Sequence, residues 1–194
     1  MSDHDKLILT DCDGVLMNWE YAFIIWMKRH GYEPIPGNLS YDIGERFGLP
    51  KARTKELVKM FNESAAIGFL PPLRDAMYYI DLLHRKHGYV FHMITSLSLD
   101  PNAQQLRIEN AKKLFGETVF EKFVFLDTGA DKDEALAPYK DSGLLWVEDK
   151  PENAQLGLDM GLDAVLIEHG HNMHLKDILL LKNWKEVYEY VTGQ

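Results

Sequence analysis

Short apolar segments alternate along the chain with longer segments in which apolar residues recur at helical spacing. Five of the apolar segments have the length of buried strands, and they cover residues 6–9, 89–94, 122–126, 143–149 and, as the last strand, 163–168. The amphipathic segments predict helices over residues 17–29, 51–64, 74–87, 102–115, 133–139, 153–160 and 183–191. Because strands that alternate with helices are typical of a mostly parallel sheet covered on both faces, the pattern predicts an α/β fold.

The stretch between the first two predicted strands is too long for a simple crossover connection. Proline and glycine interrupt residues 32–50, so turns and at most a short helix are expected there. We interpret residues 16–71 as a small helical cap inserted over the carboxyl edge of the sheet. Residues 1–15 and 72–194 then form the core.

Composition and charge narrow the classes of partner. With 194 residues, of which 46% are hydrophobic and 26% charged, the chain fits one packed domain with an inserted subdomain. The net charge of -9, with no basic run to offset it, argues against binding to nucleic-acid polymers or anionic membranes. It does not argue against a small anionic substrate held by local cations or a metal ion.

The expected location is the cytoplasm. Cys12 is the single cysteine, which excludes an intramolecular disulfide and fits a reducing compartment. The opening residues, MSDHDK, are polar and acidic, unlike a signal peptide. Since no apolar run approaches the roughly 20 residues that span a bilayer, a soluble protein is expected.

Two carboxylates follow the first predicted strand. Asp11 and Asp13 stand two positions apart just past the strand, where Gly14 allows the chain to curl and bring them together. Such a pair suits a nucleophile and a neighbouring acid/base, because different surroundings can separate their pKa values. An Asp-Gly turn, or half of a calcium loop, would show the same residues, and the pattern alone leaves these alternatives open.

Further polar residues follow the later strands. Thr95 and Ser96 can hold a phosphoryl oxygen, with a helix N-cap as the alternative. Lys132 can neutralise a phosphorylated aspartate, with a solvated surface charge as the alternative. Glu148 and Asp149 are hard oxygen ligands of the kind that suits Mg²⁺, with an acidic helix start as the alternative. All of these groups are expected on one rim, because the carboxyl ends of parallel strands share one edge.

The order of these elements resembles the haloacid dehalogenase superfamily, with "DCDGV", "MITS", a lysine and "EDKPEN" in the places of its motifs. The resemblance implies a Rossmann-like three-layer α/β/α core with Mg²⁺ as cofactor. It makes Asp11 the nucleophile and Asp13 the general acid and base, and the presence of Asp13 favours a phosphatase over a dehalogenase. The implied phosphoryl ligands are Thr95, Ser96 and Lys132, and the implied metal ligands are Asp11, Asp13 through its carbonyl, and Asp149.

The chain also resembles the 5'(3')-deoxyribonucleotidase family over nearly its whole length, although residues 32–64 match only loosely. "DCDGVLMNWE", "GFLPPLRDA", "TSLS", "ADK", "LLWVEDKPEN" and "HGHNMHL" follow the family's order and approximate spacing. Two residues depart from it: Glu148 stands where the family usually has aspartate, and Ala130 leaves the lysine loop without a neighbouring arginine. The resemblance implies a small-molecule nucleotide substrate and allows a homodimer.

Specificity is expected to lie in the cap. Trp19 and Phe23 share a helix face at i, i+4 spacing and can stack on a nucleobase, with packing inside the cap as the alternative. By the resemblance, Trp19 and Phe69 are the best candidates for substrate contact. Three histidines at H-x-H-x-x-H spacing favour a loop-closing role over a zinc site, because no cysteine or acid partner accompanies them. These are His169, His171 and His174.

The sequence therefore predicts a Mg²⁺-dependent phosphomonoesterase for nucleoside monophosphates, with deoxyribonucleotides expected, acting through an aspartyl-phosphate intermediate. Two alternatives stay open. One is a phosphatase of the same superfamily for another small phosphate, such as a sugar phosphate. The other is a non-catalytic Mg²⁺- or nucleotide-binding module on the same fold, against which the complete set of catalytic residue types argues.

Overall fold

The computed structural model describes residues 6–38, 40 and 42–194. Residues 1–5, on which the expectation about a signal peptide rests, lie outside this part of the chain. Within it, six strands form one sheet in the order β3-β2-β1-β4-β5-β6, and all neighbouring strands are parallel. The strands are β1 (Leu7–Thr10), β2 (Val90–Ser96), β3 (Phe120–Leu126), β4 (Leu145–Glu148), β5 (Asp163–Ile167) and β6 (Leu179–Leu181). The predicted α/β class with a parallel sheet is confirmed.

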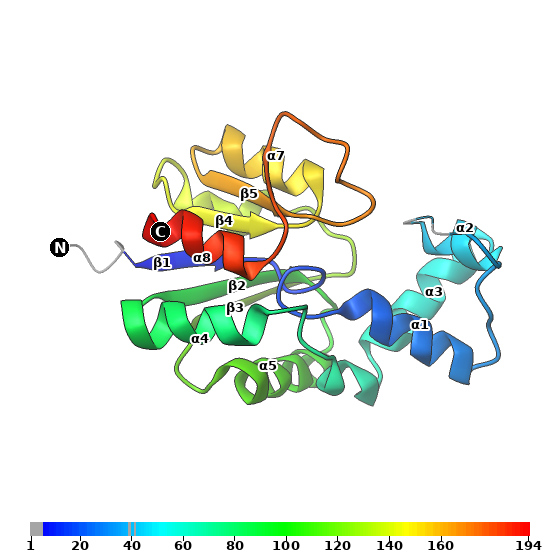
Figure 1. Cartoon of the computed structure of the whole chain (residues 1–194). Coiled ribbons are helices and arrows are strands. Elements are labelled where there is room, and N and C mark those ends of the chain that lie inside the picture. The colour runs from blue at the N-terminus through cyan, green and yellow to red at the C-terminus, as the bar shows by residue number, and fades with distance from the viewer. Residues whose placement is uncertain (1–5, 39, 41) are drawn as a thin grey trace.

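Helices cover the two faces of the sheet (Figure 1). One face packs against α4 (Ala76–His87), α5 (Pro101–Phe115) and α8 (Trp184–Thr192). The other face packs against α6 (Asp133–Leu136), the 3-10 helix η2 (Ala137–Tyr139) and α7 (Pro151–Asp159). The three-layer α/β/α arrangement is therefore present.

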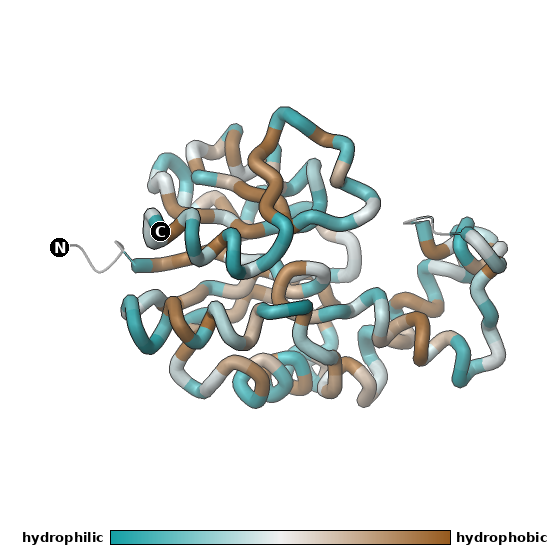
Figure 2. The backbone as a smooth tube through the Cα atoms, viewed as in Figure 1, coloured by the Kyte–Doolittle hydropathy of each residue, from teal (hydrophilic) through white to brown (hydrophobic). Residues whose placement is uncertain are grey.

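The side chains of β1 show why this strand lies in the middle of the sheet. Leu7 and Leu9 belong to the apolar cluster on one face, and Ile8 belongs to the cluster on the other. All three are buried, as expected for a central parallel strand with helices on both sides. Figure 2 shows the strands as hydrophobic segments at the centre, with hydrophilic residues on the outer loops.

The sheet has one strand more than the sequence pattern predicted. The segment 163–168 was expected to hold the last strand, but β6 pairs in parallel with β5 and forms the edge of the sheet. With three residues, β6 is too short to show a period, and its strand conformation depends on the ladder that β5 offers. Among the described residues, no helix is both long and apolar enough to cross a membrane.

Three further helices lie beyond the carboxyl ends of the strands, apart from the two helical layers: α1 (Trp19–Arg29), α2 (Ile43–Phe47) and α3 (Lys51–Asn62) (Figure 1). The 3-10 helix η1 (Ala65–Phe69), which follows them, packs against α5. The side chain of Asn62 links this unit to the sheet, because it accepts a hydrogen bond from Trp19 Nε1 at 2.9 Å and donates one to Leu97 O at 3.0 Å. The loop after β2 is thereby fastened to α1 and α3.

Candidate active site

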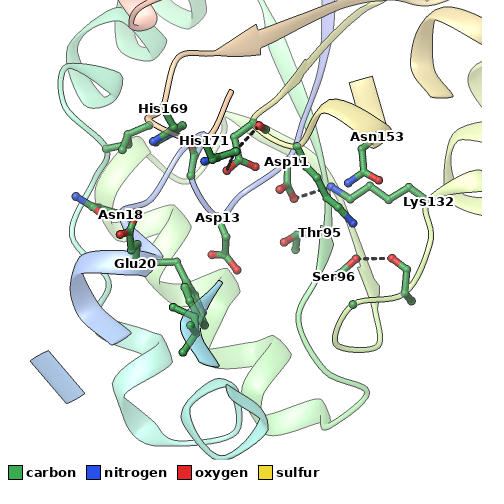
Figure 3. Close-up of a pocket in the computed structure, with 18 of the residues that line it drawn as sticks. Asp11, Asp13, Asn18, Glu20, Thr95, Ser96, Lys132, Asn153, His169 and His171 are labelled. Atoms are coloured by element: carbon green, nitrogen blue, oxygen red, sulfur yellow. Dashed lines mark hydrogen bonds and ion pairs between the residues drawn. The ribbon is translucent and has the colours of Figure 1, made fainter. Parts of the chain in front are cut away.

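A pocket of about 570 Å³ lies at the carboxyl edge of the sheet, and Figure 3 shows it in close-up. Asp11 is held at its floor because its backbone N–H continues the ladder past β1 and donates to Val147 O at 2.9 Å. The structure gathers on this one rim polar groups that lie at or after the carboxyl ends of five strands, β1 to β5. The lining includes Asp11, Asp13, Trp19, Thr95, Ser96, Lys132, Asp149, Asn153, His169 and His171.

Lys132 lies between two buried carboxylates. Its Nζ is 2.9 Å from Asp11 Oδ1 and 2.6 Å from Glu148 Oε1, and only 2% of the side chain is exposed. Burial alone would lower the pKa of Lys132, but Asp11 and Glu148 raise that pKa above its usual value. For Asp11, burial raises the pKa to about 7 although Lys132 opposes the shift. The surface-charge alternative for Lys132 is wrong.

Glu148, whose role the sequence left open, holds neighbouring groups of the site in place through hydrogen bonds. Its Oε1 accepts hydrogen bonds from Lys132 and from Asn153 Nδ2 at 2.7 Å. Its Oε2 accepts from the backbone N–H groups of Asp149 and Lys150, at 2.7 and 2.8 Å. Burial would raise the pKa of Glu148, but Lys132 and these donors lower it. The carboxylate is thus charged and occupied by the protein, and it orients Lys132 rather than a ligand.

Asp149 is a carboxylate with less compensation, because the positive charge of Lys132 offsets only part of the rise in its pKa. Burial raises its pKa well above the usual value, and the negative charges of Glu148 and Asp11 add to the shift. Gly14 passes so close that a Cβ atom there would lie 2.4 Å from Asp149 Oδ2. Gly14 also has φ of +77°, which other residues rarely adopt. Glycine is therefore required both for the turn and for the approach to Asp149.

The donor set fits a hard divalent cation. Among the described residues, the one group of three metal-ligating side chains is Asp11, Glu148 and Asp149, whose ligand atoms lie within 4.8 Å of one another. Since Glu148 is occupied by its four donors, Asp11 and Asp149 are the carboxylates that a cation would meet. Buried carboxylates that repel each other and exceed the charge of Lys132 are the surroundings in which a divalent cation gains most.

The hydroxyl group of Thr95 indicates a position where the pocket could bind an anion. Thr95 is 1% exposed, and its Oγ1 has no hydrogen-bond partner within the described part of the chain. A buried hydroxyl without a partner costs free energy, unless a ligand supplies the partner. Ser96 is engaged locally, because its Oγ donates to Ala130 O at 3.0 Å. The N-cap of α5 is Asp100, so the alternative capping role for Thr95 is wrong.

The sequence reasoning missed the partner of Asp13. Arg107 on α5 is 0% exposed, and its Nη1 lies 2.5 Å from Asp13 Oδ1. The same guanidinium donates to Cys12 Sγ at 2.7 Å, and burial raises the pKa of that thiol to about 12, so the thiol is neutral. The signal in the sequence was that Arg107 falls on the buried face of a predicted helix. The neighbouring sequence does not indicate which carboxylate it pairs with.

The two aromatic candidates have different positions. Trp19 lines the pocket, stacks on Phe23 at 4.7 Å between ring centroids, and meets the edge of Phe61 at 5.5 Å. Phe69 does not line the pocket: its side chain is 72% exposed, and Lys113 Nζ lies 6.0 Å from its ring centroid. The structure therefore does not place Phe69 in the pocket, contrary to the expectation from the resemblance. The 3-10 turn η1 buries Ile67 instead and turns the next aromatic ring outward.

The histidines at positions 169 and 171 fasten loops of the site. His169 Nε2 lies 2.6 Å from Gly14 O, and His171 Nε2 lies 3.0 Å from Asp149 O. Because a carbonyl only accepts, each Nε2 donates. Asn172 Nδ2 adds a second bond to Asp149 O at 2.8 Å. These contacts agree with the loop-closing interpretation, and the described residues hold no group of histidines suited to a metal.

The pocket also contains residues that the sequence reasoning did not select. Asn18, Glu20, Ile43, Leu73 and Arg74 form its outer part. Arg74 has φ of +41°, an uncommon conformation for a non-glycine residue, and its guanidinium donates to the carbonyl groups of Glu168 and Lys182. Turns of this kind carry no periodic signal, so only the folded chain reveals that these residues line the same pocket as Asp11 and Asp13.

Comparisons with known proteins support the fold more than the function. No protein-family profile matches the chain. One curated relative, an uncharacterized 32.4 kDa protein of the Gp30-rIII intergenic region of Enterobacteria phage T4, is 26% identical over 140 residues. The match includes 69% of this chain and 49% of that protein, so it spans about half the length of the curated relative.

The chain has the fold of haloacid-dehalogenase-type hydrolases. A hydrolase of the haloacid dehalogenase-like family, SP0104 from Streptococcus pneumoniae, has a TM-score of 0.63 at 17% identity, with 95% of this chain and 97% of that one covered. CbbY from Rhodobacter sphaeroides in complex with phosphate has a TM-score of 0.59 at 18% identity, with 94% and 96% covered. L-2-haloacid dehalogenase from Xanthobacter autotrophicus has a TM-score of 0.61 at 10% identity, with 97% and 99% covered. At these identities the likeness establishes the fold, and the reaction must be argued from the site.

Proposed function

We propose that this protein is a Mg²⁺-dependent phosphomonoesterase that hydrolyses nucleoside monophosphates, preferably deoxyribonucleotides, through an aspartyl-phosphate intermediate. One observation carries the proposal: the buried Asp11 carboxylate is paired with Lys132 in a pocket where the Thr95 hydroxyl has no hydrogen-bond partner among the described residues. A nucleophile, a cation and a free donor around one space are what transfer of a phosphoryl group requires. A haloalkanoic acid, by contrast, would need no proton donor at Asp13.

In the first step, Asp11 attacks phosphorus and forms an acyl phosphate while the ester P–O bond breaks. Asp13 gives its proton to the leaving oxygen, and Lys132 and Thr95 bind the phosphoryl oxygens. In the second step, Asp13 takes a proton from water, and the hydroxide formed attacks phosphorus. The Asp11–P bond breaks, inorganic phosphate leaves, and Asp11 returns as a carboxylate.

Asp11, Asp149 and the backbone carbonyl of Asp13 are the groups that would hold Mg²⁺. Bound there, Mg²⁺ supplies charge neutralisation to the phosphoryl oxygens. Glu148 and Asn153 keep Lys132 in place beside them. His169 and His171 hold the two loops that carry Gly14 and Asp149.

Mg²⁺ is expected to raise the unfolding temperature of the wild-type chain, and Asp149→Asn is expected to abolish this increase. A ligand at 100 times its Kd stabilises the folded state by about 2.7 kcal/mol, or roughly 5–10 °C here. Without Mg²⁺, Asp149→Asn should be at least as stable as wild type, because the substitution removes a repelled, buried charge. Thermal unfolding with and without Mg²⁺ measures both effects.

The matched control is Asp127→Asn, since Asp127 also follows a strand but is exposed and outside the pocket lining. That variant should keep the Mg²⁺-dependent increase. An unchanged unfolding temperature of the wild type at millimolar Mg²⁺ would contradict the metal site.

The proposed nucleotide substrate rests on Trp19. Trp19 lines the pocket together with Ile43 and Leu73, which gives the outer pocket an apolar part of the kind that suits a nucleobase. We also propose that residues 16–71 act as the cap of this pocket, because Trp19 and Ile43 reach the pocket from α1 and α2. A cytoplasmic location and a homodimer stay predictions of the sequence.

A sugar phosphate is the second candidate substrate. A CbbY mutant from Rhodobacter sphaeroides has been solved with xylulose-(1,5)bisphosphate, at a TM-score of 0.57 and 17% identity to this chain. The outer pocket here also offers Asn18, Glu20 and Arg74, polar groups that could bind sugar hydroxyls. The choice between the two classes depends on whether the indole of Trp19 or these polar groups dominate recognition.

A panel of nucleoside and sugar monophosphates, assayed for phosphate release with Mg²⁺ and with EDTA, tests the proposal. Nucleotides are expected to have the highest kcat/KM, EDTA should abolish turnover, and Trp19→Ala should lower nucleotide kcat/KM about 10- to 100-fold, the loss of one stacking contact. Equal rates for nucleotides and sugar phosphates would favour the second candidate. No release from any phosphomonoester would favour a non-catalytic binding module.

A further inference from the structure

Arg107 is a buried cation that the proposed reaction does not yet use. It comes from α5, on the face of the sheet that also packs against α4 (Figure 1). Its side chain is 0% exposed, although arginine is almost never fully buried without a partner. The residues one turn before and after it, Ala103 and Ala111, are small and buried, which leaves room for a guanidinium on this helix face.

The contacts of Arg107 converge on the catalytic loop. Nη1 donates to Asp13 Oδ1 at 2.5 Å, and Nη2 approaches Asp13 Oδ2 at 3.4 Å. Nη1 also donates to Cys12 Sγ, whereas Nε has no hydrogen-bond partner in the described part of the chain. The only ion pair of Arg107 among the described residues is with Asp13. The guanidinium is out of water, and the carboxylate of Asp13 is the charge that compensates it.

The contact with Arg107 fixes the side chain of Asp13. Asp13 comes after the end of β1 and next to Gly14, and its backbone forms only an isolated bridge with Met17, so no regular strand or helix restrains its side chain. Arg107 contacts both carboxylate oxygens, and a planar fork of two N–H groups fixes the plane of a carboxylate better than a single donor does. The side chain of Asp13 stays 23% exposed, and it lines the pocket.

We propose that Arg107 is a positioning residue that holds the Asp13 carboxyl group in the orientation required to give its proton to the leaving oxygen. This inference rests on the proposed phosphomonoesterase function. Arg107 does not touch the substrate, and it acts through Asp13 alone. Loss of Arg107 should therefore reduce proton transfer by Asp13 and leave attack by Asp11 largely intact.

Substrates with different leaving groups separate this role from simple packing. An alkyl phosphate, such as the best nucleotide, needs its leaving oxygen protonated, whereas p-nitrophenyl phosphate releases a phenol acidic enough to leave as an anion. For Arg107→Met we expect kcat/KM to fall about 10²-fold on the nucleotide, a typical contribution of general acid catalysis, and less than about 10-fold on p-nitrophenyl phosphate. Asp13→Asn should show the same pattern, and the double variant should be no worse than Asp13→Asn.

Asn110→Leu is the matched control. Asn110 lies on the same buried face of α5, three residues further on, and its Nδ2 donates to Leu70 O at 3.1 Å rather than to Asp13. This variant should affect both substrates equally. Arg107→Lys keeps the charge without the fork, and partial recovery on the nucleotide alone is expected. Equal losses on both substrates in Arg107→Met, as in the control, would overturn the positioning role.

Unfolding temperatures test the pair independently of activity. If Arg107 and Asp13 support each other, the double variant Asp13→Asn/Arg107→Met should be more stable than the sum of the two single effects. Additive effects would overturn the inference even in an active enzyme. An inactive wild type with strong coupling would instead refute the proposed function and the catalytic purpose of the pair, while the contact itself would stand.

Discussion

Asp11→Asn is expected to abolish turnover, with a loss on the order of 10⁴-fold or more, and to keep the fold. Asparagine has the same shape, but its amide cannot form an acyl phosphate. The stability should change little, because Lys132 keeps Glu148 as a partner at 2.6 Å and one buried carboxylate is removed from a cluster that repels. Phosphate release by the purified variant, together with its unfolding temperature, measures both parts.

The control for this substitution is Asp127→Asn, the same chemical change at an exposed position after β3. It should retain wild-type activity. The nucleophile assignment fails if Asp11→Asn keeps substantial phosphatase activity after contaminating phosphatases have been excluded. It is further supported if radiolabelled phosphate stays on the wild-type chain after acid quenching and is missing from Asp11→Asn.

Lys132→Met is expected to have the largest effect on stability as well as abolishing activity. The substitution leaves Glu148, which is 0% exposed, without its cation. Breaking a buried ion pair in this way costs about 3–5 kcal/mol. The lost activity has a separate cause, because Lys132 also contacts Asp11 and balances its negative charge. Urea denaturation measures the first effect, and phosphate release measures the second.

A second substitution separates the two effects. Lys132→Met combined with Glu148→Gln should recover much of the lost stability, because the uncompensated charge is removed, and it should stay inactive. Lys150→Met is the matched control: Lys150 lines the same pocket but is exposed, and its loss should change stability by less than about 0.5 kcal/mol. If Lys132→Met is as stable as Lys150→Met, the buried pair contributes nothing to folding.

The link between the helices α1 and α3 and the loop after β2 bears on how the pocket is assembled. Asn62 joins Trp19 to Leu97, and Ser98 Oγ donates to Glu63 Oε1 at 2.7 Å. The same loop follows Thr95, the proposed phosphoryl ligand. The side chain that is proposed to meet the base is therefore hydrogen-bonded, through Asn62, to the loop that follows the proposed phosphoryl ligand.

The sequence by itself determined the α/β class, five strands of the sheet and the gathering of Asp11, Thr95, Lys132 and Asp149 on one rim. These follow from local information: runs of apolar residues define strands, and the carboxyl ends of parallel strands must meet at one edge. The end of the first apolar run also places Asp11 and Asp13 directly after β1. Their proximity to the polar groups at the ends of the later strands could therefore be predicted.

Only the tertiary structure decided which charged groups pair. Arg107 and Asp13 are 94 positions apart, and nothing in either segment names the other. Glu148 holds Lys132 through a buried hydrogen bond. The packing of η1 turns Phe69 away from the pocket. The strand β6 pairs with β5, whose ladder gives this short segment its strand conformation. Such contacts depend on long-range packing and on the desolvation of charge. The periodic pattern of hydrophobic and polar residues contains no information about either.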